Sequence, residues 1–289
     1  MATLAGLSET DLEGLCRTLG VAARDLKVSA LGGGLYERSY HLSSDGGDWV
    51  VRLPVGGVAP CGLELSAEQR LLEKLGAAEL TPTIVPSEPS AGVLITRYLP
   101  QAASWCAVDA REPDNITRIA KRLRDLHRIE ADLPPFRASR IAGAYRRLAG
   151  ERQRMTQEQL DWGREFVDLA RAYDAESSPS TLCHNDLVAA NILDDGQLWF
   201  IDFEYAVCAE PILDLASLAS MNDFDAAQRA CLLDAYYQGA APPFSTKMFA
   251  DVIRLSRFVG YFWALAYRRN DREAAPVDRF VENMAAVLR

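Results

Sequence analysis

The sequence predicts an α+β protein in which an antiparallel sheet near the N-terminus precedes a larger, mainly helical part. The first observation is an alternation of apolar and polar residues over 28–54, interrupted by glycine-rich turns, which is typical of paired strands. The second is helical periodicity in most of the chain after residue 98. With 289 residues, the chain is long enough to bury a large core as one domain or two packed lobes.

Composition and charge narrow the class of protein. Hydrophobic residues make up 49% of the chain and charged residues 25%, a mix typical of folded globular proteins. The formal net charge of -9 gives no general attraction to nucleic acids or anionic membranes, so we expect neither as a partner. The cysteines form no C-x-x-C pair, no basic leader segment begins the chain, and no apolar run is long enough to span a membrane. We therefore expect a cytoplasmic protein with reduced thiols and no membrane insertion.

The first predicted lobe covers residues 1–97. Ser8 begins a helix that Gly20 ends. The run Gly32-Gly33-Gly34 between two strands could bring backbone amides close to phosphate groups, although such runs more often form plain hairpin turns. The predicted elements are, in order, a helix over 8–20, three strands within 28–54, a helix that begins at Ser66, and strands at 83–85 and 93–96.

The second predicted lobe covers residues 98–289 and is mainly helical. Proline and an inward apolar stripe indicate a helix over 113–131. We expect its His127 to be a buried, hydrogen-bonded packing residue and not a catalytic base. Helices over 140–150 and 156–174 are amphipathic with arginines on their outer faces, and another helix is predicted over 251–269.

Three polar residues share a spacing that kinase catalytic loops use. Asp186 lies in a loop, Asn191 is the fifth residue after it, and Asp202 follows an apolar run beyond a hairpin signal at Asp195-Gly196. In such loops the first aspartate receives a hydroxyl proton, while the other two residues hold magnesium against nucleotide phosphates. The sequence therefore predicts a small-molecule kinase that uses ATP and Mg²⁺. Asp214, farther on, is predicted to cap a helix or to hydrogen-bond this loop.

A cation and an acid in the first lobe fit the same chemistry. Arg52 is the single cation of the strand Trp49–Leu53, and Glu68 lies in the first turn of the following helix, with Glu64 as a competing partner. A strand cation paired with a helix glutamate is the kinase device for holding nucleotide phosphates. Arginine always carries its charge and makes two-pronged contacts, so it suits this role. The alternative is a surface ion pair of little consequence.

These motifs resemble the choline/ethanolamine kinase branch of the aminoglycoside phosphotransferase-like superfamily. The resemblance rests on HNDLVAANIL, WFIDFEYA, DLASLA and the arginine-bearing strand VVRLP. It implies a bilobal protein-kinase-like fold, ATP and Mg²⁺ as cofactors, and an alcohol as acceptor. The phosphate loop departs from the branch pattern, because Gly33-Gly34-Leu35-Tyr36-Glu37 replaces Gly-Gly-Leu-Thr-Asn, with Ser39 as a possible substitute. The linker around Tyr98 is expected to bond the adenine through its backbone.

The acceptor is expected to be a choline- or ethanolamine-like alcohol. Aromatic faces with a carboxylate hold a quaternary ammonium well, and Glu204, Tyr205, Trp263 and Tyr267 supply these groups. The alternative for the two aromatics of helix 251–269 is that they pack under a loop. The chain keeps only the first tryptophan of the branch's Trp-Gly-Leu-Trp segment, so the resemblance implies a small amino or ammonium alcohol more firmly than choline itself. Other readings are an aminoglycoside, thiamine or sugar kinase, or a nucleotide-binding regulator without catalysis. The sequence leaves the oligomeric state open.

Overall fold

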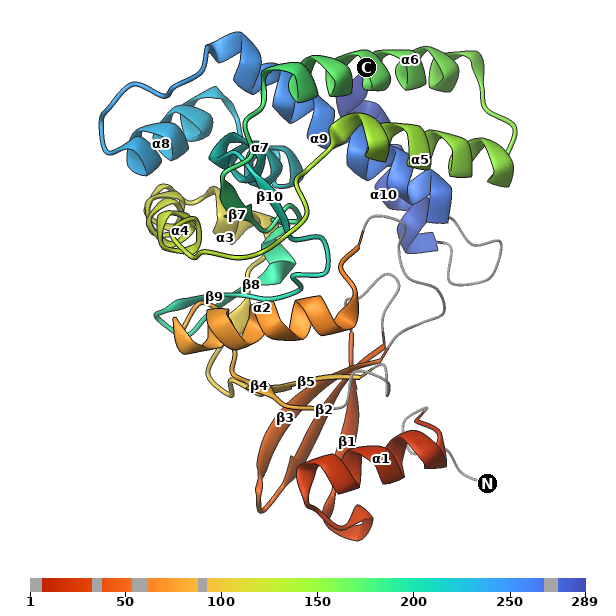
Figure 1. Ribbon diagram of the computed structural model, residues 1–289, viewed down its shortest axis with the longest axis vertical. Coiled ribbons are helices and arrows are strands. Elements are labelled where there is room, and N and C mark those ends of the chain that lie inside the picture. The colour runs from red at the N-terminus through yellow and green to blue at the C-terminus, as the bar shows by residue number, and fades with distance from the viewer. Residues whose placement is uncertain (1–6, 33–37, 54–61, 88–92, 268–274) are drawn as a thin grey trace. The chain divides into compact units, whose positions relative to one another are not determined.

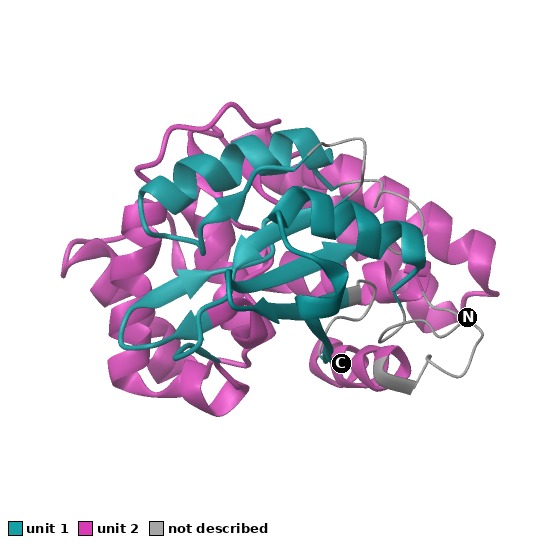
Figure 2. Ribbon diagram, turned by 90° about the horizontal axis from the view of Figure 1, so that it is seen from below, with its two compact units in different colours: residues 1–103, 193–204 teal, residues 104–192, 205–289 magenta. Residues whose placement is uncertain are grey.

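A computed structural model describes residues 7–32, 38–53, 62–87, 93–267 and 275–289. The described chain forms two compact units (Figure 2). Unit 1 comprises residues 1–103 and 193–204, and unit 2 comprises residues 104–192 and 205–289. The division passes through the short strands β6 (Ala103–Ser104) and β8 (Ile192–Asp194). A nucleotide-binding role for residues 1–97 and a catalytic role for 98–289 stay predictions.

Unit 1 contains the predicted antiparallel sheet, which has five strands in the order β1-β2-β3-β5-β4 (Figure 1). Consecutive strands β1, β2 and β3 pair as neighbours, and β5 pairs with β3 on one side and β4 on the other. The strands are β1 (Lys27–Leu31), β2 (Arg38–Ser44), β3 (Gly47–Leu53), β4 (Ile84–Val85) and β5 (Leu94–Arg97). The alternation of apolar residues therefore predicted this sheet correctly.

Two helices accompany the sheet in unit 1. In α1 (Glu9–Leu19), Ser8 accepts from the backbone of Asp11, whose side chain in turn accepts from Ser8, and the left-handed Gly20 ends the helix, as predicted. Leu15 of α1 belongs to one apolar core with Leu42 and Val51 of the sheet. Helix α2 (Leu65–Ala77) begins one residue before the predicted Ser66. The predicted hairpin forms from β8 and β9 (Leu198–Phe200).

Unit 2 is mainly helical. Strands β7 (Thr181–Cys183) and β10 (Val207–Ala209) pair antiparallel on either side of the hairpin segment in the sequence. The helices are α3 (Ala107–Arg111), α4 (Pro113–Leu126), α5 (Ala138–Arg152), α6 (Gln157–Glu176), α7 (Pro211–Met221), α8 (Ala226–Tyr237), α9 (Thr246–Tyr267) and α10 (Ala275–Leu288). The antiparallel sheet followed by mainly helical structure confirms the predicted α+β class.

Helices α7 and α9 form the centre of unit 2. Every residue of α7 from Ile212 to Ser220 is buried, as expected of a helix enclosed on all sides. Helix α9 packs against α5, α6, α7 and α10, and its Phe262 stacks on Phe166 of α6 with ring centroids 5.3 Å apart. The polar residues of α7 consequently need partners inside the protein.

Two helix boundaries differ from the sequence prediction. Helix α4 ends at Leu126 and not at 131, because the next residue, His127, turns its ring into tertiary hydrogen bonds, and the chain closes in tighter three-residue turns. Helix α9 begins at Thr246, five residues before the predicted start, because the hydroxyl of Ser245 accepts from the backbone N–H of Met248. Both boundaries depend on hydrogen bonds that the spacing of apolar residues does not reveal.

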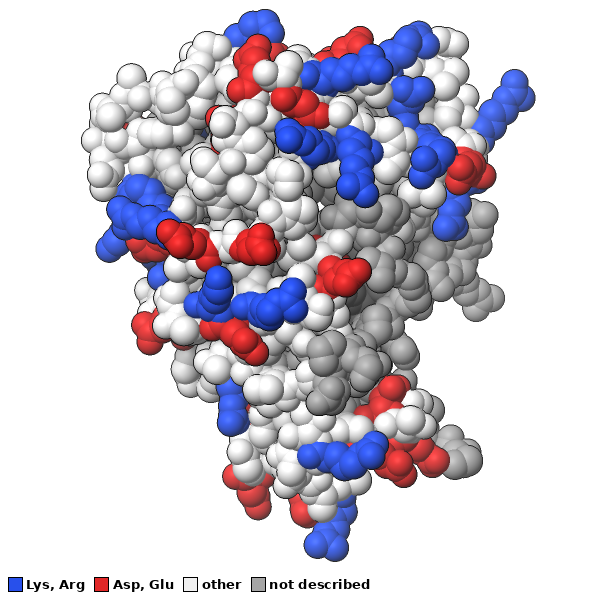
Figure 3. All heavy atoms as spheres, viewed as in Figure 1, with Lys and Arg blue, Asp and Glu red and all other residues white. Residues whose placement is uncertain are grey.

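Acidic and basic side chains are interspersed on the face drawn in Figure 3, and basic ones gather over α5 and α6. The arginines of these two helices are mostly exposed, as predicted, with examples at Arg140, Arg147 and Arg164. Of the helices in the described ranges, none is both long and apolar enough to cross a lipid bilayer.

Candidate active site

The loop between β7 and β8 brings Asp186 and Asn191 together. Asn191 ends a short 3₁₀ turn, Ala189–Asn191, and is 8% exposed. Its side-chain Nδ2 donates to the backbone oxygen of Asp186 at 3.0 Å and to the carboxylate Oδ2 of the same residue at 3.1 Å. Because the amide nitrogen is occupied by Asp186, the amide oxygen of Asn191 is the atom left to accept or to coordinate.

Asp214 in the first turn of α7 fixes the start of this loop. Its fully buried carboxylate accepts from the backbone N–H of His184 at 2.8 Å and from that of Asn185 at 2.7 Å. Asn185 has a left-handed backbone, with φ of 65°, a conformation that asparagine adopts more readily than most non-glycine residues. The prediction that Asp214 hydrogen-bonds the loop is confirmed.

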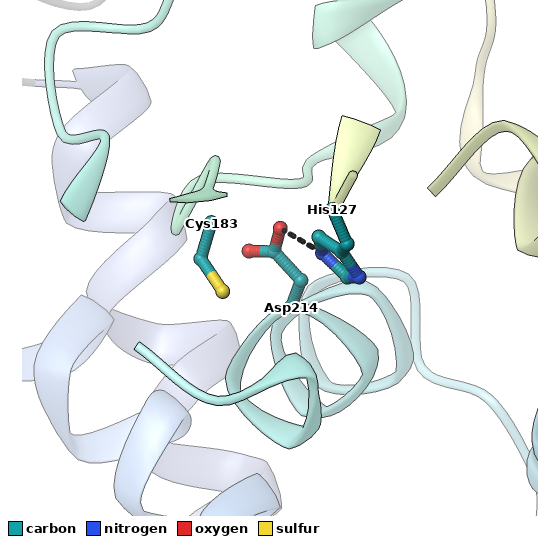
Figure 4. A group of neighbouring side chains, drawn as sticks. All are labelled: His127, Cys183 and Asp214. Atoms are coloured by element: carbon teal, nitrogen blue, oxygen red, sulfur yellow. Dashed lines mark hydrogen bonds and ion pairs between the residues drawn. The ribbon is translucent and has the colours of Figure 1, made fainter. Parts of the chain in front are cut away.

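His127 forms a hydrogen bond with the same carboxylate (Figure 4). Its Nε2 lies 3.1 Å from Oδ2 of Asp214, and a carboxylate only accepts, so Nε2 carries the donated proton. In the neutral ring, Nδ1 then accepts from the hydroxyl of Tyr236 at 2.7 Å. The side chain of His127 is 4% exposed, which confirms a buried, hydrogen-bonded packing residue.

Cys183 belongs to the same buried group. Its Sγ, a carboxylate oxygen of Asp214 and a ring nitrogen of His127 lie within 4.8 Å of one another. Burial, followed by the charge of Asp214, raises the pKa of the Cys183 thiol well above its ordinary value. Burial is also the main cause of the raised pKa of Tyr236. A protonated thiol, together with a carboxylate already occupied by backbone N–H groups, makes this group a structural cluster.

Two residues that sequence reasoning missed also hold the loop. The hydroxyl of Ser217 accepts from the backbone N–H of Leu187 at 3.3 Å. The side chain of Asn222 accepts from the N–H of Ala189 and donates to the oxygens of Leu187 and Leu218, at distances of 2.8–2.9 Å. A polar residue on a buried helical face is the only sequence signal available for such a role, and DLASLASMN contains several.

In unit 1, Arg52 links two acids. Its Nη1 donates to Oδ1 of Asp202 at 2.6 Å, and its Nη2 donates to Oε2 of Glu68 in a short contact. The side chains of Arg52 and Glu68 are 13% and 3% exposed, so this pair is not a surface ion pair. Burial raises the pKa of Glu68, Arg52 opposes that shift, and Asp202 adds to it. The pairing of Arg52 with Glu68 follows the sequence prediction, whereas its contact with Asp202 was not predicted.

Asp202 has the most unusual backbone of this group. Its φ is 69°, in the left-handed region, two residues after the end of the apolar strand β9. The next residue, Phe203, is fully buried. Oδ1 of Asp202 is bonded to Arg52, and the side chain of Asp202 is 32% exposed, so the carboxylate remains accessible to solvent.

The other predicted nucleotide residues lie on the sheet of unit 1. Ser39 of β2 is the cross-strand partner of Arg52. The backbone N–H of Tyr98 donates to the oxygen of Asp48 at 3.1 Å, and its ring lies 4.0 Å from that of His41, centroid to centroid. The predicted phosphate loop, residues 33–37, lies outside the described residues.

The predicted acceptor residues fall into both units. Glu204 belongs to unit 1, where its backbone oxygen accepts from Leu63. In unit 2, Nε1 of Trp263 donates to the hydroxyl of Tyr205 at 3.0 Å, and the rings of Trp263 and Tyr267 lie 5.8 Å apart. On the same helix, a Cβ added at Gly260 would lie 3.4 Å from the ring of Phe280 and 3.6–3.8 Å from the side chain of Met221.

Sequence relatives share part of their length with this chain. A relative described as protein LicA, from Haemophilus influenzae, is 24% identical over 235 residues, which cover 71% of this chain and 61% of the relative. A LicA homolog of Mycoplasma capricolum subsp. capricolum is 27% identical over 141 residues, or 46% of this chain and 56% of the relative. The chain thus matches less than two thirds of the length of either protein.

Solved structures share the fold over most of the chain. A choline/ethanolamine kinase family protein from Mesorhizobium loti has a TM-score of 0.73 at 23% identity, covering 90% of this chain and 87% of its own. LicA in complex with AMP has a TM-score of 0.75 at 19% identity, covering 97% and 99%. A macrolide 2'-phosphotransferase type I has a TM-score of 0.65 at 17% identity, covering 99% of both chains.

A family model described as the phosphotransferase enzyme family matches residues 27–245. The matched region includes both the Arg52 group of unit 1 and the loop that carries Asp186 and Asn191 in unit 2. Since the match covers more than half of the chain, this protein belongs to the phosphotransferase enzyme family.

Proposed function

We propose that this protein transfers the terminal phosphoryl group of ATP to the hydroxyl of a small amino alcohol, with choline- and ethanolamine-like compounds as the first candidates. The observation that carries the proposal is the double hydrogen bond from Asn191 to the backbone and carboxylate of Asp186. It brings the residue proposed as the base beside the residue proposed as an oxygen ligand, in a phosphotransferase-family chain. Such positioning is most of what phosphoryl transfer requires of a protein.

Asp186 is the proposed base. Its carboxylate orients the acceptor hydroxyl and takes its proton as the bond to phosphorus forms. Asn191 and Asp202 offer hard oxygen atoms, the ligands that Mg²⁺ prefers, so the donor set fits this metal. Bound Mg²⁺ would neutralise charge on the phosphate oxygens. Arg52, anchored by Glu68, is proposed to bind phosphate oxygens of the nucleotide, with Ser39 and the Tyr98 backbone as further nucleotide contacts.

Aromatic residues are proposed to hold the acceptor. Trp263, Tyr205 and Tyr267 form a connected group in unit 2, and ring faces attract the diffuse charge of an ammonium. Glu204 is the proposed carboxylate partner. The choline/ethanolamine kinase family protein among the structural neighbours supports this acceptor class.

The fold likeness to a macrolide phosphotransferase supports a second candidate, a kinase of a larger hydroxyl compound. An acceptor panel separates the candidates. ADP formation with Mg²⁺ and ATP would be measured with choline, ethanolamine, thiamine, a sugar, an aminoglycoside and a macrolide. We expect choline or ethanolamine to give the highest kcat/KM. Preference for a macrolide or aminoglycoside would reassign the acceptor, and nucleotide binding without transfer to any compound would indicate a regulator.

Trp263→Ala tests the acceptor site directly. We expect the KM for the amino alcohol to rise about ten-fold while the KM for ATP stays near wild type, because one cation–π contact in a desolvated site contributes about 1–2 kcal/mol. The matched control is Trp199→Ala, at a partly buried tryptophan of unit 1. Equal increases in both constants for Trp263→Ala would remove this residue from the acceptor site.

A further inference from the structure

Helix α7 is buried, yet three of its polar side chains face the loop that carries Asp186. Asp214, Ser217 and the helix-ending Asn222 are 0%, 4% and 2% exposed. Each forms a hydrogen bond with the backbone of the segment 184–189. A buried polar group without a partner lowers the stability of the folded state. These three side chains therefore avoid that cost only while the loop keeps its present position.

Asn222 uses its whole amide group. Its Oδ1 accepts from the backbone N–H of Ala189 at 2.9 Å. Its Nδ2 donates to the backbone oxygen of Leu187 at 2.9 Å and to that of Leu218, in its own helix, at 2.8 Å. A carboxylate of the same shape has no proton to donate, and a serine hydroxyl has only one. The three bonds therefore require an amide at this position.

The two loop residues that Asn222 binds flank the proposed chemistry. Leu187 directly follows Asp186, and Ala189 begins the 3₁₀ turn that ends at Asn191. That turn is closed by the backbone N–H of Asn191, which donates to the oxygen of Val188 at 3.0 Å. One side chain thus joins the residue after the base to the first residue of the turn that presents the oxygen ligand.

We infer that Asn222 is a positioning residue that fixes the spacing between Asp186 and Asn191, and through it the alignment of the acceptor hydroxyl with the metal-bound phosphate. This inference rests on the proposed function. Asn222 contacts neither substrate in this role, and it acts only through the backbone of Leu187 and Ala189. A residue that merely stabilised the core would lower stability without changing the distribution of effects between kcat and KM.

The test compares Asn222→Asp and Asn222→Ala with Ser220→Ala. Ser220 is fully buried near the end of the same helix, and its hydroxyl has no hydrogen-bond partner in the part of the chain that the structure describes. Ser220→Ala therefore perturbs the same buried helix without touching the loop. Measurements are kcat, the KM of each substrate, the Mg²⁺ concentration for half-maximal rate, and backbone hydrogen exchange at Ala189.

For both Asn222 variants we expect kcat to fall roughly ten-fold or more, since small misplacements of reacting groups have effects of this size. The Mg²⁺ requirement should rise, the KM for the acceptor should change little, and exchange at Ala189 should become faster. Ser220→Ala should match wild type in all four. Wild-type kcat and Mg²⁺ dependence in a folded Asn222→Ala protein would overturn the inference.

Ser217→Ala covers the case in which Asn222 variants do not fold, because it removes a single bond to Leu187. A smaller loss of kcat with faster exchange at Leu187 is the expected result, and wild-type values of both would contradict a positioning role for α7. The hydrogen-exchange measurements do not depend on turnover. If the wild-type protein transferred no phosphate, the proposed function would be refuted. Faster hydrogen exchange at the Ala189 amide in the Asn222 variants would still support the structural part of this inference.

Discussion

Asp202 in unit 1 and Asp186 in unit 2 are both carboxylates that follow an apolar strand, but different forces hold them. Asp202 and Glu68 both bond to the guanidinium of Arg52, so two acids face one cation in this group. Asp186 is held by the neutral amide of Asn191, and its loop is bonded to buried α7 side chains. The first arrangement depends on the balance of charge, whereas the second depends on hydrogen-bond geometry.

The contrast predicts that the charge balance in unit 1 can be changed without moving the Asp186 loop. It also predicts that the loop can be disturbed without changing that charge balance. Ion pairs in a partly solvated site respond to pH and salt. Hydrogen bonds among buried neutral groups depend mainly on the fit of donors to acceptors. Four substitutions, described from the largest expected effect to the smallest, test this separation.

Asp186→Ala should abolish transfer while leaving nucleotide binding intact. General-base removal lowers rates by about 10²–10⁴-fold, and the proposed phosphate contacts around Arg52 do not involve Asp186. Turnover and ATP affinity would be measured on the same preparation, with the exposed Asp132→Ala as the control. Wild-type-like turnover in Asp186→Ala would remove the base from its proposed role.

Asp214→Asn should chiefly affect stability. The new amide would turn an N–H toward one of the loop N–H groups or toward His127, leaving at least one buried donor unpaired, so we expect a loss of about 2–4 kcal/mol. Urea unfolding measures it, with exposed Asp168→Asn as the control. A loss as small as that of the control would mean that the α7 contacts do not organise the loop.

Arg52→Lys keeps the positive charge in unit 1 but removes the guanidinium group, whose two Nη atoms bond to two different acids. A single ammonium cannot reproduce the paired geometry, so we expect the KM for ATP to rise roughly ten-fold with a smaller change in kcat. Arg70→Lys, at an exposed position of α2, is the control. If kcat fell and the KM for ATP did not change, Arg52 would act on the reaction step and not on nucleotide binding.

Glu68 gives the smallest expected effect, a dependence of stability on pH. The folded protein raises the pKa of Glu68 above the ordinary value of 4.5, chiefly through burial, so the folded state keeps its proton where the unfolded chain has lost it. The free energy of unfolding should therefore fall as pH rises from the ordinary value through the raised pKa. Glu68→Gln should lack this contribution.

Unfolding of wild type and Glu68→Gln between about pH 4 and 8 measures that contribution as a difference between two curves. Parallel curves would show that Arg52 fully compensates the burial of the carboxylate. A difference of the opposite sign would mean that attraction to Arg52 outweighs burial.

Local signals in the sequence identified much of this molecule. The capping residues Ser8 and Gly20 predicted α1, and the five-residue spacing from Asp186 to Asn191 predicted two side chains that the structure joins by a hydrogen bond. Both rest on residues close in sequence, where backbone geometry limits the possible arrangements.

Contacts between distant residues were out of reach. The bond from Arg52 to Asp202 joins residues 150 positions apart, and that from Asn222 to Ala189 spans 33. Sequence spacing contains no information about such pairs until the fold is known. Asn222 also resembled an ordinary helix-ending residue, because its role depends on which backbone groups the fold places beside it.

The left-handed backbone of Asp202 has a consequence for which acid can serve at that position. Aspartate and asparagine are the non-glycine residues that adopt this conformation most readily, because their short polar side chains bond to nearby backbone groups. Glutamate carries the same charge and the same oxygens, but it would place a longer, more flexible chain on a disfavoured backbone. Main-chain conformation therefore favours the shorter acid at this position.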